Sequence, residues 1–110
     1  PERRDTMFEI VHIGIPTTQS KEGETYAPGA EIFVTPPEKS PFAIEYVRFL
    51  PGTVFPESMH YDVHVAAKVD SIEKYTALAD EVIVPKMDGG ACWLCFVRKD
   101  GAIIELMEEK

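Results

Sequence analysis

The chain has 110 residues, 45% of them hydrophobic and 27% charged, which is the ordinary balance of a soluble globular protein, and its formal net charge is −8. A chain of this length is expected to fold as one domain that buries about two-thirds of its unfolded surface. The acidic excess and the lack of a lysine and arginine cluster argue against nucleic-acid binding. No apolar run approaches the roughly 20 residues of a membrane span, and no signal-peptide pattern precedes the first strand. We therefore expect a cytoplasmic protein that does not bind membranes.

The first half of the chain is predicted to be rich in strands and poor in helix. Apolar runs predict strands at 8–15, 30–35 and 42–49. The segment between the first two strands is polar and carries no apolar stripe at helical spacing, so any helix there is expected to be missing or reduced. Proline and glycine signals mark residues 51–58 as a connector.

The second half predicts a strand, a helix and three further strands. The first strand covers 61–69, and the helix runs from about Ser71 to Ala79, with Asp70 as its N-cap in capping-box spacing to Glu73. The remaining strands are expected at 81–85, 91–98 and 102–107, and a Lys-Asp-Gly hairpin turn joins the last two.

The two cysteines, Cys92 and Cys95, form a C-x-x-C pattern within a predicted strand. Side chains three apart in a strand point to opposite faces, whereas a redox pair needs a turn that enters a helix. A four-cysteine zinc site would need a second pair. Two ordinary buried thiols are the favoured interpretation.

Two histidines and two glutamates interrupt apolar strands in similar contexts. His12 and Glu45 are 33 positions apart (45 minus 12), and His64 and Glu105 are 41 apart (105 minus 64). Burying a polar group without a partner costs free energy, so the two pairs are expected to satisfy one another. Together the four side chains also suit a divalent metal. The alternatives without a metal site are core histidines hydrogen-bonded to backbone carbonyls and glutamates that face solvent. His60 is either a substitute ligand or a surface histidine.

The order and spacing of these segments resemble the vicinal oxygen chelate superfamily, which includes glyoxalase I, extradiol dioxygenases and bleomycin-resistance proteins. The resemblance is strongest in the second half. It lies in Val-His-Val-Ala-Ala-Lys-Val-Asp-Ser-Ile-Glu-Lys-Tyr, in Val-Ile-Val-Pro-Lys-Met-Asp-Gly-Gly, and in Phe-Val-Arg-Lys-Asp-Gly-Ala-Ile-Ile-Glu-Leu-Met-Glu. The first half is similar through the shorter segments Val-His-Ile-Gly-Ile and Ile-Glu-Tyr-Val.

The resemblance implies an α+β fold in which paired βαβββ modules form a cupped mixed sheet around a metal. Within a single glyoxalase-like domain, module one would cover about 7–50 and module two about 59–110, and the helix of module one would be missing or reduced. The implied metal ligands are His12, Glu45, His64 and Glu105, a set most like that of bacterial glyoxalase I.

The resemblance further implies a metal-dependent lyase or isomerase that acts on a small oxygenated carbonyl or acid substrate. Ni, Co, Zn, Mn or Fe would suit these ligands and would stabilise an enolate as a Lewis acid. Glu105, in preference to Glu45, would act as the catalytic base. Lys68 is predicted to meet a substrate carboxylate, because it shares a strand face with His64, and Trp93 is predicted to line the pocket. The alternatives are a solvated lysine at a strand end and an aromatic side chain in the core.

Three alternatives stay open at this stage. A metal-free protein of the bleomycin-resistance type would use the same cup to bind a small molecule, a dioxygenase would use Fe(II) with open positions, and a small cupin ranks well below both. If His12 and Glu45 face the cup, the apolar residues next to them point outward and need cover. We expect that cover from a homodimer partner or from the 17–30 loop folded back.

Overall fold

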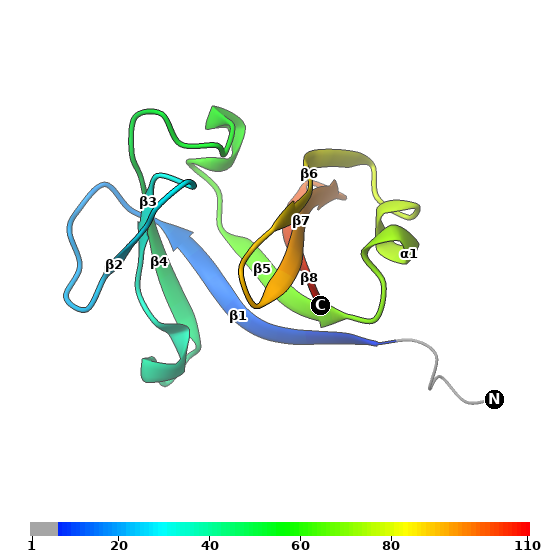
Figure 1. Ribbon diagram of the computed structural model, residues 1–110, viewed down its shortest axis with the longest axis horizontal. Coiled ribbons are helices and arrows are strands. Elements are labelled where there is room, and N and C mark those ends of the chain that lie inside the picture. Colours follow the sequence, from blue (N-terminus) through cyan, green and yellow to red (C-terminus); the bar gives the residue numbers. More distant parts are fainter. Residues whose placement is uncertain (1–6) are drawn as a thin grey trace. The chain divides into compact units, whose positions relative to one another are not determined.

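The computed structural model describes residues 7–110, and over this range the chain forms eight strands with little helix (Figure 1). This mixed, strand-rich composition agrees with the α+β class expected from the sequence. Over the described residues the chain divides into two compact units, one of residues 12–64 and the other of residues 65–110 together with residues 7–11. None of the helices in the described part of the chain is long and apolar enough to cross a membrane.

The unit of residues 12–64 contains a sheet with the strand order β2-β3-β4-β1. Its strands are β1 (Phe8–Pro16), β2 (Thr25–Ala27), β3 (Ile32–Val34) and β4 (Ile44–Phe49), with short 3₁₀ turns η1 (Pro37–Lys39) and η2 (Glu57–Met59). β1 runs parallel to β4, whereas β3 is antiparallel to both β4 and β2. The three predicted strands are present, and the chain from β1 to β2 forms no helix, as its polar composition indicated. β2 was not predicted.

The outer face of β4 is covered in part by the loop that follows β1. The Lys21 ammonium lies 4.5 Å from the centroid of the Tyr46 ring, and Glu24 forms an ion pair with Arg48. Tyr46 and Arg48 alternate with Glu45 along the strand, so the loop lies on the face of β4 opposite that carboxylate. The loop therefore covers part of the outward-facing surface of β4, as one of the two expectations from the sequence predicted.

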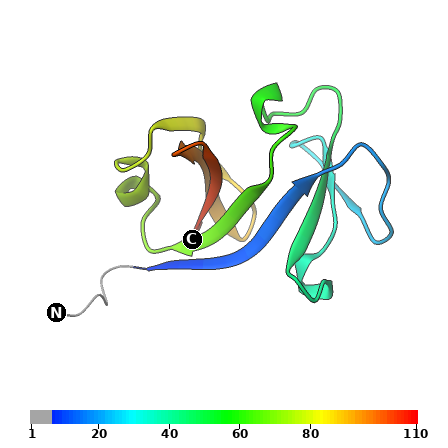
Figure 2. The same ribbon diagram turned by 180° about the vertical axis from the view of Figure 1, so that it is seen from behind.

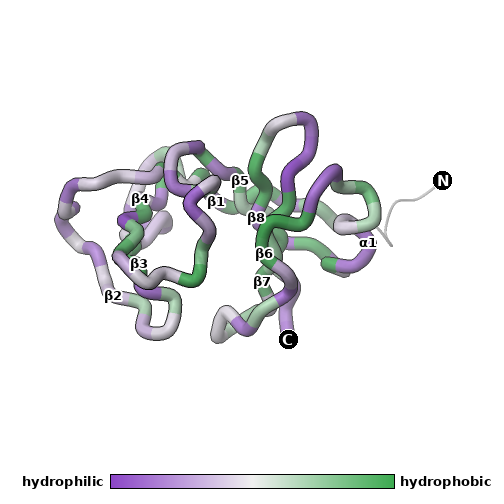
Figure 3. The backbone as a smooth tube through the Cα atoms, turned by 90° about the horizontal axis from the view of Figure 1, so that it is seen from above, coloured by the Kyte–Doolittle hydropathy of each residue, from purple (hydrophilic) through white to green (hydrophobic). Residues whose placement is uncertain are grey.

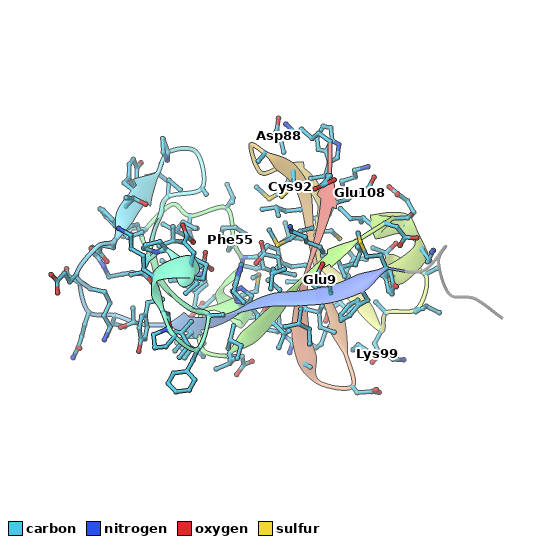
Figure 4. All side chains as sticks on the ribbon, turned by 90° about the horizontal axis from the view of Figure 1, so that it is seen from below. Glu9, Phe55, Asp88, Cys92, Lys99 and Glu108 are labelled. Carbon is cyan, nitrogen blue, oxygen red and sulfur yellow. The ribbon has the colours of Figure 1, made fainter. Side chains whose placement is uncertain are left out.

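The unit that contains residues 65–110 has the strand order β5-β8-β7-β6, with β1 beside β5. The strands are β5 (His64–Val69), β6 (Glu81–Asp88), β7 (Cys92–Lys99) and β8 (Ala102–Glu109). β7 pairs antiparallel with both β6 and β8, and Asp100 and Gly101 turn the last hairpin with φ values of 51° and 85°. Positive φ at both central residues is the geometry of the predicted two-residue hairpin turn. The register of β7 and β8 places Cys92 near Glu108 at one end of the hairpin and Lys99 at the other, as Figure 4 shows.

The helix α1 (Ile72–Thr76) is shorter than predicted and begins with a different cap. Ser71 is the N-cap, and its side chain accepts a hydrogen bond from the Lys74 backbone N–H, whereas Asp70 forms an ion pair with the Lys74 ammonium. The assignment of Asp70 as the cap is therefore corrected. In Figure 2 the helix lies beside the last strands of the chain, and it packs against β6, β7 and β8.

The core under this helix is apolar and continuous. Its buried members come from β5, α1, β7 and β8: Val69, Ile72, Cys95, Val97 and Leu106. Figure 3 shows hydrophobic residues along β6, β7 and β8, whereas the segment between β1 and β3, which includes β2, is mostly hydrophilic. Within each unit the first strand lies beside the fourth, followed by the third and the second. That shared order agrees with two similar modules, while their assembly into one cup stays a prediction.

Candidate metal centre

Three of the four predicted ligands lie together within the unit of residues 12–64. His12 comes from β1, Glu45 from β4 and His64 from the first position of β5. Each offers a ligand atom, and these atoms lie within 4.8 Å of one another. His12 Nε2 is 3.3 Å from Glu45 Oε1, and the two imidazole centroids are 6.0 Å apart at an interplanar angle of 75°.

Strand register explains why these side chains meet. Successive residues of a strand face opposite sides, so His12 and Gly14 share the buried face of β1 while Ile13 is exposed. In the parallel pairing of β1 with β4, Gly14 lies opposite Glu45. Glu45 is therefore placed one pleat along from His12 on the same face of the sheet.

Gly14 is a part of this centre that the sequence analysis missed. A Cβ atom built on Gly14 would lie 2.0 Å from His64 Cε1 and 2.3 Å from its Nε2, so the imidazole occupies the space above the glycine. Only a residue without a side chain lets His64 lie against β1 here. The available signal was the position of the glycine two residues after His12, on the same strand face.

The chemistry and spacing of these donors fit a divalent transition metal. Two ligands about 2.1 Å from one ion at a tetrahedral angle lie about 3.4 Å apart, close to the contact between His12 and Glu45. His12 and His64 are each only 7% exposed, so water competes little for their nitrogens. Two imidazoles with one carboxylate also form the donor set of many metal enzymes with open coordination positions.

The fourth predicted ligand, Glu105, belongs to the other unit. It lies on β8 opposite Phe96 of β7 and is 7% exposed. Cys92 lies on the same face of β7 as Phe96, and burial together with the negative charge of Glu105 raises the pKa of the Cys92 thiol. The carboxylate is therefore buried beside a neutral thiol, and its participation in the metal centre stays a prediction.

The two predicted substrate residues differ in their surroundings. Lys68 is exposed on β5, and its role stays a prediction. Trp93 packs against the core that contains Ile72 and Cys95. Because Trp93 is three residues from Phe96, it faces the side of β7 opposite the one that Phe96 and Glu105 share. The structure therefore does not bring Trp93 to Glu105.

The remaining histidine, His60, is held by a backbone contact and by aromatic stacking. Its Nε2 lies 2.9 Å from the carbonyl oxygen of Phe55, and its ring stacks on Phe49 with centroids 4.1 Å apart. Phe55 itself packs edge-on against Phe49. His60 is not a member of the candidate ligand group among the described residues, which favours the surface-histidine alternative over a substitute ligand.

The cysteines behave as the strand interpretation predicted. Both are free thiols, with Cys95 buried in the core and Cys92 partly buried on the opposite face of β7. Burial raises the pKa of both thiols, so neither is activated as a thiolate.

Comparison with known proteins adds no assignment: no family model, no curated protein and no solved structure matches this chain.

Proposed function

We propose that this protein binds a divalent metal and acts as a glyoxalase-like lyase or isomerase on a small oxygenated carbonyl or acid. The observation that carries the proposal is the convergence of His12, Glu45 and His64, with a glycine that makes room for one imidazole. Two buried imidazoles and one partly buried carboxylate are brought together, and polar groups removed from water need partners that satisfy them. A metal ion is a partner that all three side chains can bind at once.

The chemistry follows from the donor set. A divalent ion held there would supply Lewis acidity toward a substrate carbonyl, which makes a neighbouring carbon–hydrogen bond more acidic. The protein must then supply a base, and we assign this role to Glu105, with Glu45 held by its contact with His12. As the fourth ligand predicted from the sequence, Glu105 would also bring the charge of two carboxylates and one divalent ion to zero.

A groove in the same unit supports a small-molecule substrate. The groove has a volume of about 630 Å³ and is lined by Thr17, Gln19, Phe49, His60 and Tyr61, among others. Phe49 lies on the same face of β4 as Glu45, although none of the three candidate ligands lines the groove itself. The described residues that line the groove include no lysine or arginine, so a small oxygenated molecule fits better than a highly anionic coenzyme.

A metal-free binding protein is the second candidate. The contact of 3.3 Å between His12 and Glu45 is within reach of a charge-assisted pair, so these two groups can stabilise one another without an ion. In that case the groove alone would carry the function.

Metal titration of the wild-type protein and matched variants tests the proposal. The wild type should bind one equivalent of Zn, Ni, Co, Mn or Fe(II), and Glu45→Gln or His64→Gln should weaken binding at least about 100-fold, because each removes a direct ligand. The controls are Glu9→Gln, an exposed carboxylate on β1, and His60→Gln, and neither should change the stoichiometry.

The outcome separates the two candidate functions. Stoichiometric binding lost only in the ligand variants, with unchanged circular dichroism, would support the metal centre and justify assays with hemithioacetals and epimerisable acids. No binding by the wild type would reject it and leave the metal-free binding protein as the candidate.

A further inference from the structure

A second groove lies on the outer face of β4, in the unit of residues 12–64. It has a volume of about 510 Å³. Ile44 and Tyr46 form part of its wall, and both alternate with Glu45 along the strand, so the groove lies on the side of the sheet opposite that carboxylate. Lys21, from the loop after β1, and Lys39, from η1, also line it.

The charge of this groove contrasts with that of the whole chain. The protein carries a formal charge of −8, and six of the nine lysines and arginines in the described range form ion pairs: Arg48, Lys74, Lys86, Arg98, Lys99 and Lys110. The other three are Lys21, Lys39 and Lys68. Two of these three lysines line the same groove, and Glu22 is the one acidic residue among the described residues that line it. The groove is therefore a local positive site on an acidic protein.

Two residues with hydroxyl groups, Thr35 and Ser40, line the same groove as the two lysines. The Thr35 hydroxyl oxygen accepts a hydrogen bond of 2.8 Å from the Tyr46 backbone N–H, and the Ser40 hydroxyl oxygen accepts one from the Phe42 N–H. Each oxygen is fixed by the backbone as an acceptor, which leaves its own hydrogen to donate. The Lys21 ammonium is also held in place, 4.5 Å from the Tyr46 ring centroid.

We propose that this groove binds a small molecule with one phosphoryl or carboxyl group on an apolar body. The two ammonium groups and the hydroxyl donors are the groups that recognise such an anion. Ile44 and Pro36 supply apolar surface for the remainder of the molecule. The site is separate from the metal centre, since the two lie on opposite faces of β4.

Titration with simple anions, followed by calorimetry and by backbone amide NMR, tests the proposal. Phenyl phosphate and benzoate represent the two anionic groups on an apolar body, and inorganic phosphate represents the anion alone. We expect saturable binding of at least one aromatic anion, tighter than that of inorganic phosphate, with shifts confined to residues 21–23, 35–40 and 44–46. The preferred aromatic anion identifies the headgroup.

Charge variants supply the decisive comparison. Lys21→Gln and Lys39→Gln should each weaken binding about three- to five-fold, as expected for a partly exposed charge contact, and Glu22→Gln should strengthen it. Lys99→Gln removes one positive charge at a surface ion pair outside the groove and should leave the affinity unchanged. Metal content should be the same in all four variants. No saturable binding, equal binding of phenyl phosphate and inorganic phosphate, or equal effects of Lys21→Gln and Lys99→Gln would overturn the proposal.

Discussion

The space above Gly14 is filled by the imidazole of His64, and this close approach gives a prediction at the scale of a single residue. Gly14 does not have a positive φ, so alanine is compatible with its backbone, and the cost of Gly14→Ala is the collision of the new Cβ with the ring 2.0 Å away. We expect a loss of about 1–3 kcal/mol in the free energy of unfolding and weaker metal binding, measured by urea denaturation and metal titration.

A double mutant tests whether the collision is the cause. His64→Ala removes the ring, so Gly14→Ala should cost little in that background, with a coupling energy of about 1 kcal/mol or more between the two positions. Equal costs of Gly14→Ala with and without the ring would contradict the packing that the structure shows.

The grouping of candidate ligand residues could be predicted from the sequence, but the role of the glycine could not. A histidine or glutamate inside an apolar strand is conspicuous because burial demands a partner. A glycine in a strand has several explanations, among them a bulge, a bend or a close approach. Only the contact of Gly14 with His64 in the folded chain decides that at position 14 the reason is a histidine ring. The sequence also left open whether Trp93 lines a pocket or packs in the core, because an aromatic residue type does not fix which face of a strand is buried, and in the structure it packs against the core.

At the scale of the element, the cap of α1 gives the next prediction. The sequence favoured Asp70 because of the spacing to Glu73, yet Ser71 receives the Lys74 N–H. Ser71→Ala should therefore lower the free energy of unfolding by about 1 kcal/mol, whereas Asp70→Asn removes only an exposed ion pair and should cost less. Thermal unfolding of the two variants measures the difference. A larger loss of stability in Asp70→Asn than in Ser71→Ala would indicate that Asp70 is the N-cap.

The loop after β1 is anchored by an ion pair whose effect depends on pH. The hydrogen bond from Arg48 holds the pKa of Glu24 below its usual value. A carboxyl group with a lowered pKa in the folded state adds stability above its unfolded pKa of about 4.3, and this is lost as the pH falls through the folded value. Glu24→Gln should therefore lower the melting temperature at pH 7, and the difference from the wild type should shrink below about pH 4. Glu38→Gln, at an exposed position in η1, is the control. A difference that does not depend on pH would contradict the ion pair.

Strands were predicted better than helix boundaries for a physical reason. The strands of the second half are marked by apolar runs and by turn residues, such as Asp100 and Gly101, whose backbone geometry is specific. β2 is three residues long and half exposed, so its pairing depends on contacts such as the one between Tyr26 and Phe33 rather than on an apolar pattern. The helix ends at Thr76, and Leu78, inside the predicted helical range, is 63% exposed, so its side chain contributes little burial that would favour a longer helix.

At the scale of the whole molecule, hydrogen exchange tests whether one unit or both bind the metal. The three grouped ligands lie in the unit of residues 12–64, whereas Glu105 lies on β8 of the other unit. An ion that binds only the folded state slows the exchange of amides in the segments that it stabilises. If Glu105 is the fourth ligand, saturating metal should slow exchange both in 12–64 and in β8, measured on peptides by mass spectrometry. Glu105→Gln should then keep the first effect and lose the second. Slower exchange confined to 12–64 in the wild type would instead show a three-residue centre, and the catalytic base would have to be sought elsewhere than Glu105.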